Sequence, residues 1–239
     1  MTGPREPSPW EASRRAAGDV ALPASLVLLA ALALVIAYYH LPAVGLALDR
    51  LGAISRSGGL AFAAGLTALT AGLIPWLLRM AMPSLRPAHP WKDLLHSLVW
   101  WALMGIVVSS FYRLLTAAFG DQPSLGVVAV KVLFDSTLFT MLVGSPGNAL
   151  SHLWKDLGWD LAELRRHLRP GWYRRIVVPN LLPNWVVWIP GAAIFYSLPL
   201  DLQLPVANGI GCCWALLCVR IAAHSSGADP VSGSSHPSA

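Results

Sequence analysis

The feature that most constrains this chain is a series of apolar runs, each about long enough to cross a lipid bilayer. A helix rises about 1.5 Å per residue, so roughly 20 residues span the ~30 Å hydrocarbon core. About six such runs occur, at 23–41, 58–78, 94–117, 125–143, 176–198 and 204–222. Only 12% of the 239 residues are charged, about half the share in soluble domains. The sequence therefore predicts an all-α fold, a polytopic transmembrane helix bundle in which four to six runs span.

The fifth run, 176–198, is the weakest of these predicted spans. Pro179, Pro183 and Pro190 interrupt it, and each proline removes a backbone donor and disfavours a straight helix. A kinked or broken helix inside the bundle would let the freed carbonyls find partners there. A re-entrant or interfacial segment is the alternative.

The segment 148–168 is amphipathic and is expected to form one helix in the membrane interface. Its apolar residues recur at helical spacing, namely Leu150, Leu153, Trp154, Leu157, Leu161, Leu164 and Leu168. Charged residues fill the opposite side, namely Lys155, Asp156, Asp160, Glu163, Arg165 and Arg166. A helix packed on the bundle from the aqueous side is the alternative. On either side of a single membrane domain at 20–223, the polar segments 1–19 and 224–239 are predicted to be disordered tails.

The basic residues predict the orientation of the bundle. With six spans and the amino terminus inside, the inner side collects Arg5, Arg14, Arg15, Arg79, Arg86, Lys92, Lys155, Arg165, Arg166, Arg169, Arg174, Arg175 and Arg220. The outer side holds Arg50 and Arg56. Basic residues remain on the cytoplasmic side of membrane proteins, so both termini are predicted to be cytoplasmic. The basic inner rim is expected to contact anionic lipid head groups, and we do not predict a nucleic-acid partner.

The most informative residues are charges inside the apolar runs. Lys131 and Asp135 lie four residues apart, on one face of a helix, and Asp135 falls close to the middle of its run. A short turn at Gly120 and Asp121 would bring Arg113 of the preceding run within reach of Asp135. Intramembrane charges are costly and are commonly functional. The three residues could line a polar path or gate, or form a buried ion cluster that fixes helix register.

Signals for enzymatic chemistry are thin, and we predict that the protein is not an enzyme. The seven histidines are scattered without metal-ligand spacing, and His96 has no evident catalytic partner. Cys212, Cys213 and Cys218 share one apolar run, which suits packing better than a disulfide framework or a zinc site. No catalytic residue, metal or cofactor is predicted.

The carboxy-terminal half resembles the Mpv17/PMP22 family of small membrane proteins. The family's K-V-x-x-D-Q element is similar to Lys131-Val132-Leu133-Phe134-Asp135-Ser136. Its closing pattern and terminal helix are similar at Asn184, Trp185, Trp188, Pro190, Phe195, Pro199, Asn208 and Trp214. The chain departs from the family where Gly72-Leu73-Ile74-Pro75-Trp76 replaces a G-D-x-x-Q element. The resemblance implies a helical membrane protein, and channel-like solute permeation has been proposed for some family members.

These observations give two functional hypotheses. One is a channel-like pore or permeation modulator for small solutes or ions, with Lys131, Asp135 and Arg113 at its gate. The other is a non-conducting structural or interaction protein that binds anionic lipid or a partner. A bacterial-type plasma membrane is the default location, and a mitochondrial inner or peroxisomal membrane applies if the source is eukaryotic. The sequence leaves open whether the protein forms a homo-oligomer.

Overall fold

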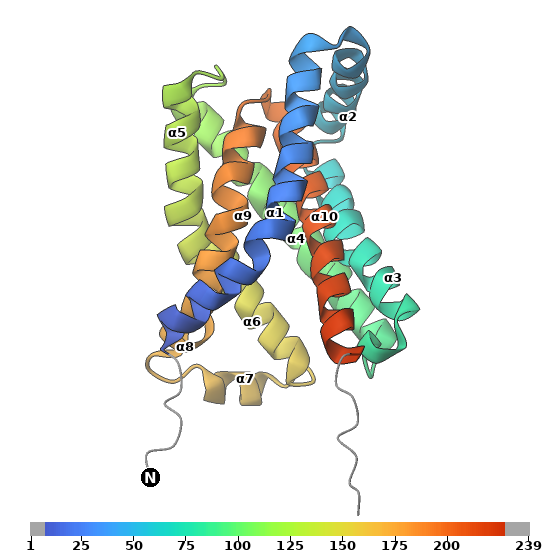
Figure 1. Ribbon diagram of the computed structural model, residues 1–239, viewed down its shortest axis with the longest axis vertical. Helices are drawn as coiled ribbons and strands as arrows, with labels where there is room; N and C mark the ends of the chain where they lie inside the picture. The colour runs from blue at the N-terminus through green and yellow to red at the C-terminus, as the bar shows by residue number, and fades with distance from the viewer. Residues whose placement is uncertain (1–7, 228–239) are drawn as a thin grey trace, which may run out of the picture.

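The computed structural model describes residues 8–227, and every regular element in that range is a helix (Figure 1). The long helices are α1 (Pro9–His40), α2 (Pro42–Thr67), α4 (Pro90–Phe119), α9 (Val178–Tyr196) and α10 (Leu200–Gly227). The shorter α-helices are α3 (Ile74–Ala81), α5 (Leu125–Phe134), α6 (Ser145–Asp156), α7 (Leu161–His167) and α8 (Trp172–Ile176). Two π-helical segments, η1 (Ala68–Leu73) and η3 (Asp135–Gly144), and a 3-10 turn, η2 (Pro83–Leu85), complete the order.

Within residues 8–227, six helical stretches are long and apolar enough to cross a membrane. They are Ala21–His40, Pro42–Ala81, Pro90–Phe119, Leu125–Asp156, Val178–Tyr196 and Leu200–Leu217. The predicted all-α membrane bundle is therefore confirmed. The helices run up and down the bundle, and both ends of the described chain lie at its lower end in Figure 1. The loop around η2 and the segment with α7 and α8 lie at this end too.

The proline-rich fifth run forms one continuous helix, α9. Pro179 lies in the first turn, where a helix has no use for the missing N–H. Pro183 and Pro190 lie inside the helix, whose side chains Leu181 and Val187 are buried. The helix packs along α1 and against α10 (Figure 1). Tertiary packing therefore overrides the local disfavour of the prolines.

The structure corrects both predicted tails. Ser8 caps α1 in a capping box with Glu11, and Pro9 takes the first helical position, so residues 9–19 are helical. This signal at the amino end outweighs the polar composition that suggested disorder. At the other end α10 continues to Gly227, so residues 224–227 are helical as well. The remaining parts of these predictions, 1–7 and 228–239, lie outside the described residues.

The prediction of a single amphipathic helix at 148–168 is wrong, because two helices occupy this segment. Its first half belongs to α6, which continues the fourth span without a break. The chain then turns where Gly158 and Trp159 adopt φ values of 68° and 64°. Asp160 caps the separate helix α7 by accepting hydrogen bonds from the N–H groups of Ala162 and Glu163. Left-handed backbone at two successive residues cannot continue a helix, and α7 lies across the lower end of the bundle (Figure 1).

Two glycines let α4 approach α2 and η1 closely. A Cβ atom on Gly105 would lie 2.4 Å from the carbonyl oxygen of Ala63 and 2.7 Å from Thr67 Oγ1. A Cβ atom on Gly72 would lie 3.2 Å from the carbonyl oxygen of Ser97. Small residues allow this contact between backbones, which is a main source of helix association in lipid. The contact fixes one wall of the cavity described below.

The π-helical segment η3 interrupts the fourth span, and neighbouring helices hold its backbone. Trp185 Nε1 donates a hydrogen bond to the carbonyl oxygen of Ser136 at 2.9 Å. The Tyr173 hydroxyl donates to the carbonyl oxygen of Met141 at 2.8 Å. These side chains from α8 and α9 therefore hold the backbone of the wider turn against its neighbours.

Candidate functional site

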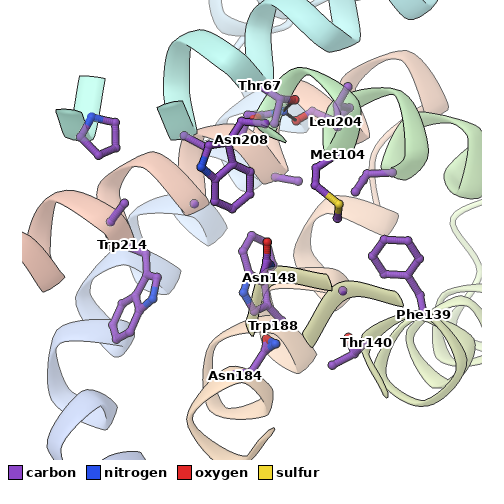
Figure 2. A pocket seen from close by; sticks show the side chains of 18 of the residues that line it. Thr67, Met104, Phe139, Thr140, Asn148, Asn184, Trp188, Leu204, Asn208 and Trp214 are labelled. Atoms are coloured by element: carbon purple, nitrogen blue, oxygen red, sulfur yellow. Dashed lines mark hydrogen bonds between the residues drawn. The ribbon is translucent and has the colours of Figure 1, made fainter. Parts of the chain in front are cut away.

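A cavity of about 580 Å³ lies between the helices (Figure 2). It runs from Arg79 and Lys155, near the lower end of the bundle, to Tyr112 and Asp135. On α4 it follows residues 97 to 112, a length of about 22 Å at the α-helical rise. A cavity of this length covers most of the ~30 Å hydrocarbon core of a bilayer.

Amides and hydroxyls are placed at intervals along the mostly apolar wall between these ends. Figure 2 shows Asn148, Asn184, Asn208, Thr67 and Thr140 among the lining side chains. Tryptophans 101, 188 and 214 and apolar side chains such as Met104 and Phe139 form the rest of the wall. A polar lining inside an apolar bundle lowers the cost of bringing a polar solute away from water.

The three asparagines differ in which atoms of their side-chain amides form hydrogen bonds. Asn208 donates from Nδ2 to Thr67 Oγ1 at 3.1 Å and accepts at Oδ1 from Thr70 Oγ1 at 2.8 Å, so it holds α10 against α2 and η1. Asn148 Oδ1 accepts from Trp100 Nε1 at 2.9 Å. Since an indole N–H can only donate, this bond fixes the orientation of the Asn148 amide. The Asn184 Oδ1 atom is buried and has no partner among the described residues.

The end of the cavity at Asp135 is formed by a hydrogen bond between helices. The Tyr196 hydroxyl on α9 donates to Asp135 Oδ2 at 2.7 Å, and Tyr196 is only 2% exposed. Lys131 Nζ lies over the face of the same ring, 5.8 Å from its centroid. Lys131 is 1% exposed and donates to Thr116 Oγ1 at 3.0 Å. Tyr196 therefore contacts both charged groups, the carboxylate through its hydroxyl and the ammonium group through its ring face.

Of the three predicted gate residues, only Asp135 lines the cavity. Lys131 is buried beside it, and the expected direct pair of Lys131 with Asp135 is absent from the ion pairs formed within residues 8–227. Arg113 is exposed and does not line the cavity. Tyr112 and Leu115 are buried and face the bundle. Arg113 lies on another face of the helix and therefore points outward.

Large buried side chains fill the bundle above Asp135. Tyr112, Phe195 and Tyr196 pack with ring centroids 4.7 to 5.3 Å apart. Leu198, in the turn before α10, and Leu202, in the first turn of α10, belong to the same core. We refer to these five residues as the outer plug. In the described structure the cavity ends at this plug.

Ion pairs surround the opposite end of the cavity. Asp93 is 2% exposed and accepts from Arg79 at 2.7 Å, and it lies 3.1 Å from Lys155 Nζ. Lys155 also lies 3.6 Å from the exposed carboxylate of Asp156. The Arg79 and Lys155 side chains line the cavity together with His152. These ion pairs fix α3, α4 and α6 relative to one another.

A histidine–serine contact lies outside the cavity, and its geometry argues against catalysis. His96 Nε2 lies 2.9 Å from Ser151 Oγ, and Trp159 Nε1 donates to His96 Nδ1 at 3.2 Å. An indole N–H cannot accept, so Nδ1 carries the lone pair and Nε2 carries the proton. His96 therefore donates to Ser151 and cannot remove its proton in this arrangement. Among the described residues, no three His, Cys, Asp or Glu side chains gather as metal ligands would.

The positions that suggested a family resemblance are mostly in or near the cavity. Asn184, Trp188, Asn208 and Trp214 line it. Trp185 bonds to η3, and Phe195 is part of the outer plug. Pro190 lies inside α9, and Pro199 is exposed in the turn before α10.

Tyr196 is one of the site residues that the sequence did not reveal, because an isolated tyrosine at the end of an apolar run looks like an interfacial anchor; Asn148, Thr67 and Thr140 are others. No family model, curated protein or solved structure matches this chain. The resemblance to the Mpv17/PMP22 family therefore stays a prediction.

Proposed function

We propose that this protein is a channel-like permeation protein for small solutes or ions. The observation that carries the proposal is the cavity, which places a series of polar side chains in a mostly apolar wall, from the charged rim at Arg79 and Lys155 to the buried carboxyl group of Asp135. A membrane protein gains nothing in stability from polar side chains spaced along a hollow of this length, because polar groups inside a bilayer are costly unless they are used. Solutes enter at the charged rim and stop at the outer plug.

The outer plug acts as the gate in this mechanism. Passage requires Tyr196 to move, which breaks its hydrogen bond to Asp135. A hydrogen bond to a charged group contributes about 1.5–3 kcal/mol, so this contact favours the closed state by a factor of ten or more. Once Tyr196 has moved, the Asp135 side chain faces the pathway. Among the described residues that line the cavity, Asp135 is the only one with a carboxylate. The carboxylate then favours cations over anions.

The proposal also includes the orientation of the bundle in the membrane and the family to which the chain is related. The end of the bundle with Arg79, Lys155 and the basic α7–α8 segment faces the cytoplasm, in accordance with the distribution of basic residues. The membrane is a bacterial-type plasma membrane, and the chain is a divergent relative of the Mpv17/PMP22 proteins. No catalytic step is assigned to it, because the His96–Ser151 contact lacks a base.

Single-protein recordings in planar bilayers test the proposal. In an asymmetric KCl gradient the wild type should conduct with a preference for potassium, and Asp135→Asn should shift the reversal potential toward that of chloride. Tyr196→Phe keeps the ring and removes only the hydroxyl, so it should raise the open fraction about tenfold. Asp121→Asn removes an equivalent charge at an exposed position and serves as the matched control. Wild-type recordings indistinguishable from empty lipid would refute the proposal.

A non-conducting interaction protein is the second candidate. The observation that favours it is the exposed group of arginines 165, 169, 174 and 175 beside the exposed apolar side chains Leu161 and Leu168. This surface suits contact with anionic lipid head groups. Under this alternative, Asp135→Asn lowers stability in a chemical unfolding titration and no variant conducts.

A further inference from the structure

A second hollow lies on the outside of the bundle, between α4, α6 and α7, and it is separate from the cavity. Its volume is about 940 Å³, and its walls are almost entirely apolar. Leu95, Val99 and Leu103 of α4 form one side, and Leu150 of α6 and Leu164 of α7 form the other. We call this hollow the α4–α6–α7 groove. Because its walls are apolar and open, lipid rather than water is the medium that fits it.

The groove has the length of one leaflet. It follows α4 from residue 92 to residue 103, which is about 16 Å at the α-helical rise. Half of a ~30 Å hydrocarbon core is about 15 Å. The groove begins at the lower end of α4 and therefore covers the depth of an acyl chain from the leaflet on that side. Leu161 and Leu164 of α7 also line the groove.

A positive charge stands at the rim. The Lys92 ammonium lies 5.9 Å from the ring centroid of Trp159. Lys92 is exposed and forms no ion pair with the residues that the structure describes. By contrast, Lys155 nearby is held by two carboxylates. A free ammonium group at the level of the head groups complements an anionic phosphate.

The wall beneath this charge is held in place before any lipid binds. Trp159 has an unfavourable left-handed backbone, with φ of 64°, and its Nε1 bond to His96 fixes the ring. The neighbouring Trp154 ring also packs against His96, with centroids 5.7 Å apart. Its Nε1 atom is buried and has no hydrogen-bond partner within the described part of the chain. This N–H group is covered by protein, so Trp154 contributes its ring, and not its donor, to the wall of the groove.

We propose that the α4–α6–α7 groove binds one anionic phospholipid, with an acyl chain along α4 and the phosphate at Lys92. This binding site is independent of the proposed permeation function. The depth of the groove matches the acyl chain, the free ammonium group matches the phosphate, and the fixed tryptophans provide the apolar wall.

Native mass spectrometry of the delipidated full chain in detergent tests this site. Protein is titrated with dioleoyl phosphatidylglycerol and, separately, with dioleoyl phosphatidylcholine, which has the same acyl chains. One basic residue near a membrane surface favours an anionic lipid by about fivefold. We expect one phosphatidylglycerol molecule to bind about five times more tightly than phosphatidylcholine. Lys92→Gln should remove this preference and leave phosphatidylcholine binding unchanged.

Two further variants separate the groove from the surface. Val99→Trp fills the groove from an exposed position, 61% accessible, and should weaken binding of both lipids at least tenfold. Arg174→Gln removes an exposed charge outside the groove and should keep the preference. Equal losses in Lys92→Gln and Arg174→Gln would indicate diffuse surface attraction and overturn the site. Unchanged binding in Val99→Trp, with the unfolding transition of the wild type, would overturn it as well.

Discussion

Replacing Gly105 with alanine should separate two helices that now touch through their backbones. The new Cβ atom would lie 2.4 Å from the carbonyl oxygen of Ala63, whereas ordinary contact begins at 3.4 Å. The α2 and α4 backbones must therefore move apart by about 1 Å. Thr67 would meet the same atom at 2.7 and 2.8 Å, so its hydrogen bond from Asn208 is disturbed too.

The magnitude follows from these two losses. Overpacking of this kind costs about 1–3 kcal/mol, and an interhelical hydrogen bond in a membrane protein contributes about 0.6 kcal/mol. Alanine also gains up to about 1 kcal/mol over glycine in helix propensity. Gly65→Ala has the same gain without the clash, since nothing lies within 4 Å of its Cβ position. We therefore expect Gly105→Ala to be less stable than Gly65→Ala by about 2–3 kcal/mol.

Equilibrium unfolding in mixed micelles, with increasing mole fraction of dodecyl sulfate, measures this difference. Far-ultraviolet circular dichroism and tryptophan fluorescence provide two readouts of the same transition. Both variants are read against the wild type, and their difference isolates the steric contribution because helix propensity cancels. Unfolding free energies that agree within about 0.5 kcal/mol would refute the close approach of α2 and α4.

Two further predictions concern charges at the lower end of the bundle. Asp93→Asn should destabilise the protein by about 2–4 kcal/mol in the same titration, because Arg79 and Lys155 lose the buried carboxylate that both contact; a loss under about 1 kcal/mol would contradict this role. The N–H groups of Glu163 and Ala162 hold the pKa of Asp160 below its ordinary value, so the cap on α7 contributes stability above the unfolded pKa and loses it as pH falls through the lowered folded pKa. The Glu163 amide signal in NMR should follow that titration and should not titrate in Asp160→Asn; a midpoint above the ordinary aspartate value would be contrary to the expected sign.

The six spans could be predicted because each depends on local apolar length alone. The predictions were wrong at places where a few residues determine the conformation of the backbone. A capping box at Ser8 and Glu11 turned a polar tail into helix. Left-handed backbone at Gly158 and Trp159 divided the segment predicted as one amphipathic helix, and tryptophan is a residue for which no sequence rule anticipates that conformation.

The candidate site was only partly visible in the sequence. A carboxylate within an apolar run indicated Asp135, but its partner Tyr196 lies 61 residues away, and nothing local connects the two. Arg113 was assigned to the site from its height along the helix, without its direction. The buried positions Ser109, Tyr112 and Leu115 lie on one helical face and direct Arg113 away from it.

The wider turns of η3 determine which side chains share a wall with Asp135. Side chains of an α-helix rotate by about 100° per residue, so unbroken α-helix would place Asn148 about 220°, and Lys155 about 200°, around the axis from Asp135. A π-helix has about 4.4 residues per turn, or roughly 82° per residue, which reduces these angles to about 60° and 40°. Ten residues of altered winding thus rotate a polar face by almost half a circle onto the side of the carboxylate. A helical wheel drawn with uniform spacing places these residues on opposite sides.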